Sequence, residues 1–130
     1  PSVAKFFDKR INGTMKAWAG VEGWAKSHQW LTLDTTHWAT MGVQPLEAYA
    51  AAKGKLGHVH LSNYNRGKQH RLQHEGELDL GAFLRRLKAD EYDGTISVEV
   101  YPEPLEFKNS TALRRNMKAC IDFCREHLAK

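Results

Sequence analysis

The chain has 130 residues, of which 42% are hydrophobic and 26% are charged, a size and composition typical of one soluble globular domain over residues 1–130. No run approaches the roughly 18 apolar residues that a membrane span needs, so we expect no membrane contact. The net charge of +4 permits anionic partners such as phosphorylated sugars or nucleic acid, but does not require them.

The first half of the chain predicts two helices on either side of a strand. Apolar residues recur at three- and four-residue spacing over residues 14–25, which favours a helix. The short apolar run 30–34 predicts the first strand, and residues 35–43 are expected to form a loop. Pro45 suits the first turn of the next helix.

The second half continues the same alternation. A second strand is predicted over residues 58–62, followed by a long polar stretch, 63–77, with no expected secondary structure. Loops of that length in a compact domain are usually functional or mobile. Asp79 caps a third helix, residues 95–100 predict the third strand, and an amphipathic helix over residues 109–128 ends the chain.

Strands that alternate with helices indicate the α/β class, with a parallel sheet and right-handed crossovers. Parallel sheets are normally buried on both faces and have more than three strands. Three strands would leave both edges of the sheet open, and open edges need cover. We therefore expect either an incomplete domain or a sheet that is completed by a partner.

The two cysteines indicate a reducing compartment. Cys120 and Cys124 lie four residues apart on the last predicted helix, where a disulfide is geometrically poor. Reduced core cysteines fit a cytoplasmic protein better than a redox pair does.

Polar side chains end each of the three predicted strands. Asp34 ends the first strand, His60 lies in the second, and Glu99 lies in the third. Because parallel strands place their carboxyl ends at one edge of the sheet, we expect the three side chains to converge there. Two carboxylates and an imidazole suit a hard or borderline divalent cation.

Each of these residues also has a purely structural interpretation. Asp34 could simply cap a helix or turn, and His60 could be a satisfied structural histidine. Glu99 lies between two valines, so we expect it to be buried, where it must be paired, protonated or metal-bound. His37 follows Asp34 by three residues and could share its pocket.

The long polar stretch adds two further candidates. Arg66 could bind a carbonyl, hydroxyl or phosphate oxygen, and His70 could be another metal ligand, although surface solvation explains both equally well. The sequence has no glycine-rich phosphate loop, no Gly-x-Ser-x-Gly elbow and no His-Glu-x-x-His helix, which disfavours the activities those motifs support.

Taken together, three segments resemble the last three strands of the xylose-isomerase-like TIM barrels. They are 33–37 (Leu-Asp-Thr-Thr-His), 58–62 (His-Val-His-Leu-Ser) and 94–102 (Gly-Thr-Ile-Ser-Val-Glu-Val-Tyr-Pro). That superfamily holds sugar and sugar-phosphate isomerases and epimerases, and the related apurinic (AP) endonucleases of family 2. The resemblance implies a partial, half TIM barrel, with the strands and helices alternating as α-β-α-β-α-β-α.

The resemblance also implies roles for individual residues. Asp34, His60 and Glu99 match the family's metal ligands, and Glu99 also matches a catalytic carboxylate. His37, Arg66 and His70 match substrate-binding positions, with His37 and His70 serving as metal ligands in the endonucleases. Lys68 stands where the endonucleases have an aspartate, which argues against a complete endonuclease site.

These matches imply a metal-assisted proton transfer next to a carbonyl of a sugar or sugar phosphate, with manganese, magnesium, cobalt or zinc as cofactor. The second carboxylate that such a reaction uses is missing from the matched segments. We therefore expect an isolated chain to be inactive, or a homodimer to complete the barrel. The alternatives are an AP-endonuclease-like phosphodiesterase and a non-catalytic binding domain, and nucleic acid is the less favoured partner.

Overall fold

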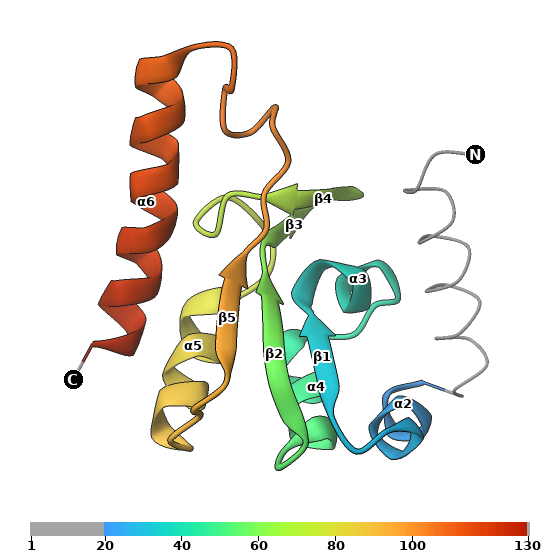
Figure 1. The fold of residues 1–130 in the computed structure, drawn as a ribbon. Coiled ribbons are helices and arrows are strands. Elements are labelled where there is room, and N and C mark those ends of the chain that lie inside the picture. The colour runs from blue at the N-terminus through green and yellow to red at the C-terminus, as the bar shows by residue number, and fades with distance from the viewer. Residues whose placement is uncertain (1–19, 130) are drawn as a thin grey trace.

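The structure is a computed structural model that describes residues 20–129. Its centre is a parallel sheet with the strand order β1-β2-β5 (Figure 1). These strands are β1 (Leu31–Asp34), β2 (Leu56–Leu61) and β5 (Thr95–Val98). The register pairs Asp34 with His60, and His60 with Ser97. The carboxyl ends of all three strands therefore meet at one edge of the sheet, as predicted.

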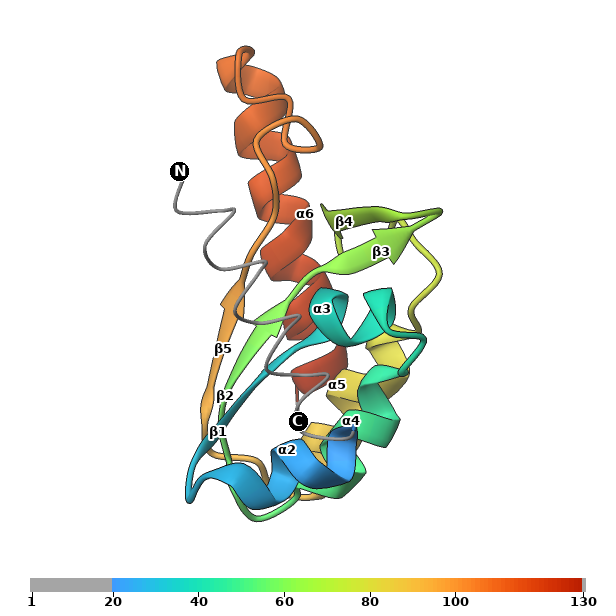
Figure 2. The same cartoon turned by 90° about the vertical axis from the view of Figure 1, so that its right-hand side faces the viewer.

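Helices alternate with these strands, in the arrangement of a partial TIM barrel. They are α2 (Val21–Ser27), α3 (Thr35–Thr40), α4 (Pro45–Ala52), α5 (Leu80–Ala89) and α6 (Ser110–Leu128). Figure 2 shows α4 and α5 on the same side of the sheet, and α6 contacts α5. Within residues 20–129, no helix combines the length and apolar character needed to cross a membrane.

The two faces of the sheet differ in chemistry because side chains alternate along each strand. Leu33, Val59 and Leu61 are fully buried, and they belong to the core that α4 and α5 help to build. The opposite face carries polar side chains, among them His58, whose Nε2 lies 2.7 Å from Ser97 Oγ. The core therefore holds the strands from one side, while the other side presents polar groups.

Two predictions of irregular structure are wrong. Residues 35–43 were expected to form a loop, but α3 begins directly after Asp34, which caps it. The polar stretch 63–77 is also partly ordered, because β3 (Asn63–Asn65) and β4 (Lys68–Arg71) form an antiparallel hairpin. Of the helix predicted over residues 14–25, residues 14–19 lie outside the described residues, and α2 covers residues 21–25.

The prediction that the two cysteines form no disulfide with each other is confirmed. Cys120 and Cys124 are both free thiols on α6. Burial raises the pKa of both, that of Cys124 to about 11, so neither is a thiolate at neutral pH. We infer packing roles for both, while the compartment remains a prediction.

A polar cluster joins α4 to α5 far from the strand ends. Asp90 receives a hydrogen bond from Arg86 Nε at 2.8 Å and one from the Tyr49 hydroxyl at 3.0 Å, and Lys53 Nζ lies 3.2 Å away. The bond from Arg86, with help from Lys53 and Tyr49, lowers the pKa of Asp90 to about 2. Burial and the neighbouring Asp90 raise the pKa of Tyr49 to about 12.

This cluster predicts a specific acid sensitivity. The stabilisation from ionised Asp90 is fully present above the pKa of an unfolded aspartate, about 3.9, and is lost as the pH falls through about 2. We expect the wild-type chain to lose stability more steeply between about pH 4 and pH 2 than Asp90→Asn does. Urea unfolding at a series of pH values measures this, and parallel curves for the two proteins would contradict it.

Candidate metal centre

Asp34 has two roles, because its two carboxylate oxygens face different partners. Oδ1 accepts hydrogen bonds from the backbone N–H groups of Thr36 and His37, each at 3.0 Å, and so caps α3. Oδ2 faces His37 Nδ1 at 3.3 Å and His60 Nδ1 at 3.7 Å. The capping interpretation and the site interpretation of Asp34 are therefore compatible.

His60 connects the carboxylates of two neighbouring strands. Its Nδ1 lies 3.1 Å from Glu99 Oε2 as well as 3.7 Å from Asp34 Oδ2. One potential ligand atom from each of Asp34, His60 and Glu99 lies within 4.8 Å of the other two. The three residues predicted to converge are thus brought together, with an O, N, O donor set that suits a divalent cation.

The prediction that Glu99 is buried is wrong. Its side chain is 48% exposed, because β5 is an edge strand that ends at Val98, one residue earlier. An exposed carboxylate needs no buried partner to explain it. The case for Glu99 as a ligand therefore depends on its convergence with Asp34 and His60, and no longer on burial.

A second group of potential ligands shares Asp34. Asp34, His37 and His70 also have ligand atoms within 4.8 Å of one another. His70 is only 4% exposed, and the His37 and His70 rings meet edge to face with centroids 5.5 Å apart. The φ of His70 is 52°, a left-handed conformation that costs energy for a residue other than glycine and that often occurs at functional sites.

Hydroxyl groups that sequence analysis overlooked hold these ligands in place. The Thr35 hydroxyl donates to the carbonyl oxygen of Ser62 at 2.6 Å and accepts from the Ser62 N–H at 3.1 Å. The Ser62 hydroxyl lies 2.7 Å from Thr36 Oγ1 and 3.2 Å from His70 Nδ1. These bonds fix the start of α3 against the end of β2. In the sequence, these hydroxyl residues could have been noticed only because they lie within two residues of Asp34 and His60.

Mutual interactions shift the ionisation of the two central ligands. Burial alone would raise the pKa of Asp34, but the contact of its Oδ2 with the His60 imidazole, the charge of His37 and the His37 N–H together lower it below 3.8. The same contact with Asp34 raises the pKa of His60 above 6.5, against an opposing effect of burial. The charge of Glu99, whose Oε2 lies 3.1 Å from His60 Nδ1, raises the pKa of His60 further.

Arg66 is not brought to the cluster. It occupies the turn of the β3–β4 hairpin with φ 48°, followed by Gly67 with φ 81°, and the turn projects away from the carboxyl ends of the strands (Figure 2). The contact recorded for Arg66 is from its backbone N–H to the Glu77 carboxylate. The substrate-binding role of this arginine stays a prediction.

Fold and site together define a partial α/β barrel with a candidate metal centre at the carboxyl ends of its strands. The family model for the xylose isomerase-like TIM barrel matches residues 8–127, so the chain belongs to that family. The family includes sugar isomerases and epimerases as well as AP endonucleases. No curated protein matches the chain significantly.

The donor set fits the divalent metals that members of this family often bind. Asp34, His60 and Glu99 supply hard oxygen and borderline nitrogen ligands at the carboxyl ends of three different strands, and the ionised state of Asp34 is favoured by its surroundings. We regard these three residues as the principal candidate site, and Asp34, His37 and His70 as a second one.

Proposed function

We propose that the chain supports a metal-assisted proton transfer next to the carbonyl group of a sugar or sugar phosphate, as in an isomerase or epimerase. The observation that carries this proposal is the convergence of Asp34, His60 and Glu99 at the ends of three adjacent parallel strands. Membership in a family that includes sugar isomerases and epimerases supports it.

Each residue has a role in this proposal. Asp34, His60 and Glu99 would hold a divalent cation, which supplies charge stabilisation for an oxygen that becomes negative during the reaction. Glu99, the exposed carboxylate, exchanges a proton with the carbon next to the carbonyl, and a second carboxylate on the opposite face of the substrate completes the transfer. His37, beside Asp34, lines the pocket and orients the substrate hydroxyl groups.

A second carboxylate would have to come from outside the described residues. Within residues 20–129, the two candidate metal groups contain only the carboxylates of Asp34 and Glu99. We propose that a second copy of the chain supplies it by facing the polar side of the sheet. Native mass spectrometry, with and without manganese, is expected to give a dimer that retains metal, and a metal-free monomer would contradict the homodimer.

The proton transfer itself can be tested through Glu99. In D₂O with added Mg²⁺, NMR is expected to show exchange of the hydrogen next to the carbonyl of a ketose substrate. Glu99→Gln should slow that exchange by about 100-fold or more, since it removes the group that accepts the proton. Lys118→Gln, at an exposed position of α6, serves as the control and should leave the exchange unchanged.

Two other functions remain as alternatives to be tested. The group Asp34, His37 and His70 favours a metal-dependent phosphodiesterase, although Lys68 stands in place of an expected aspartate. Incision of DNA with an abasic site in the presence of zinc would support the phosphodiesterase activity over the isomerase or epimerase activity. Absence of divalent metal binding, with ligand binding unaffected by Asp34→Ala, would support a non-catalytic binding domain.

A further inference from the structure

A cleft is lined by Gln69 and Arg71, the residues on either side of His70 in the sequence. It has a volume of about 390 Å³ and runs between the β3–β4 hairpin and the segment that follows β5. The side chains that line it include Lys68, Gln69, Arg71, Tyr101 and Glu103. None of the roles proposed so far uses this cleft.

Tyr101 connects the cleft to the metal centre. Its backbone N–H donates to the His70 carbonyl oxygen at 3.0 Å, and its ring lies against the His70 ring with centroids 4.5 Å apart. The His70 ring in turn contacts the ring of His37, beside Asp34. The centroids of the Tyr101 and His37 rings are therefore at most about 10 Å apart, a span that an extended sugar phosphate can cover.

The charge of the cleft favours an anion. Lys68 and Arg71 contribute two positive charges against the single negative charge of Glu103. Arg71 forms an ion pair with Glu75, whose carboxylate is 3.9 Å from the guanidinium, too far for a hydrogen bond. Arg71 keeps N–H groups that can donate to a ligand, Lys68 is exposed, and the side-chain amide of Gln69 adds a further donor.

We propose that this cleft binds the phosphate group of a phosphorylated sugar, whose carbonyl end lies at Asp34, His60 and Glu99. This inference rests on the proposed function and narrows the substrate class to sugar phosphates. Arg71 and Lys68 pair with the phosphate oxygens, while Tyr101 and Pro104 form the wall along which the sugar carbon chain passes.

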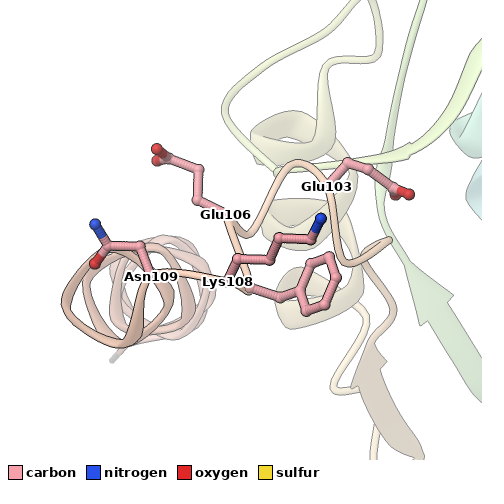
Figure 3. A pocket seen from close by; sticks show the side chains of 5 residues that line it. Glu103, Glu106, Lys108 and Asn109 are labelled. Carbon is pink, nitrogen blue, oxygen red and sulfur yellow. The ribbon is translucent and has the colours of Figure 1, made fainter.

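A neighbouring cavity provides an internal comparison. It has a volume of about 550 Å³ and is lined by Glu103, Glu106, Phe107, Lys108 and Asn109 (Figure 3). Here Lys108, whose Nζ lies 5.9 Å from the centre of the Phe107 ring, is outnumbered by two glutamates. The cavity therefore disfavours an anion, and Lys108 is a matched control for Lys68.

Calorimetric titration of the full chain with inorganic phosphate, fructose 6-phosphate and fructose tests the proposal. The same titrations are repeated with Asp34→Asn and without added metal, so that any phosphate bound through a cation at the metal centre is not counted as binding in the cleft. Phosphate and fructose 6-phosphate are expected to bind, and fructose to bind at least about tenfold more weakly. Lys68→Ala should weaken phosphate binding by about threefold to tenfold, Glu103→Gln should strengthen it, and Lys108→Ala should leave it unchanged.

The outcomes separate this inference from the proposed function. If phosphate does not bind, or if Lys68→Ala and Lys108→Ala weaken it equally, the phosphate cleft is wrong even where metal binding persists. If a short single-stranded oligonucleotide binds more tightly than fructose 6-phosphate, the ligand is a phosphodiester and the inference is overturned. If phosphate binds as expected but no divalent metal does, the proposed function fails and the cleft stands.

Discussion

Asp34→Asn is expected to lower the affinity of the chain for a divalent cation by at least about 100-fold while leaving the fold intact. The asparagine side chain retains an oxygen in the position of Oδ1, which caps α3 by accepting from Thr36 and His37. It replaces Oδ2, which faces His37 and His60, with a neutral NH₂ group that cannot bind a cation. Titration calorimetry with Mn²⁺ measures the change.

The comparison with Asp34→Ala separates the two roles of this carboxylate. Alanine removes the cap as well as the ligand, so it should reduce the free energy of unfolding by about 1 kcal/mol beyond the effect of asparagine. Urea denaturation of both variants measures that difference. Unchanged Mn²⁺ affinity in Asp34→Asn would exclude Asp34 as a ligand, and equal stability of the two variants would exclude its capping role.

The positions of the main site residues could be predicted from the sequence because strand geometry is regular. Once strands were assigned around Asp34, His60 and Glu99, the parallel arrangement alone required their side chains to meet at one edge. The strand assignments were accurate to a few residues, since each run is apolar and is bounded by turn signals. This part of the site is determined by backbone topology rather than by individual contacts.

The parts that could not be predicted depend on tertiary contacts. α3 starts with two threonines, which are poor helix formers, and it is stabilised by the cap from Asp34 and by bonds to Ser62. The burial of Glu99 was overestimated because the sequence does not reveal that β5 is an edge strand within the described residues. Arg66 was assigned by spacing alone, and spacing does not show which way a hairpin turn projects.

The hairpin after β2 is the clearest case, because one buried amide organises it. Asn63 is only 2% exposed, and its Nδ2 donates to the carbonyl oxygens of Gln73 at 2.8 Å and Leu78 at 3.2 Å. Its Oδ1 accepts from the N–H groups of Tyr64 at 2.8 Å and Leu78 at 3.0 Å. A polar stretch without apolar periodicity is therefore ordered from within, by a side chain that satisfies four backbone groups.

Asn63→Ala is consequently expected to destabilise the chain by about 3 kcal/mol or more, because buried backbone groups would lose their partners. That is a large share of the stability of a domain of this size. Gly76→Ala should lower the free energy of unfolding by a similar amount, since a Cβ at Gly76 would lie 2.2 Å from Asn63 Oδ1 and 2.6 Å from the Tyr64 carbonyl oxygen. Urea denaturation measures both effects.

Arg66→Asn is the matched control in the same hairpin. It places an Asn-Gly pair in a turn where both residues have positive φ, so it should change stability by no more than about 0.5 kcal/mol. If Asn63→Ala also kept the wild-type stability, the hairpin would be held by other contacts.

Loss of order in the hairpin should also displace His70, whose carbonyl oxygen and ring contact Tyr101. In the absence of urea, Asn63→Ala should therefore weaken phosphate binding in the cleft even in the molecules that remain folded.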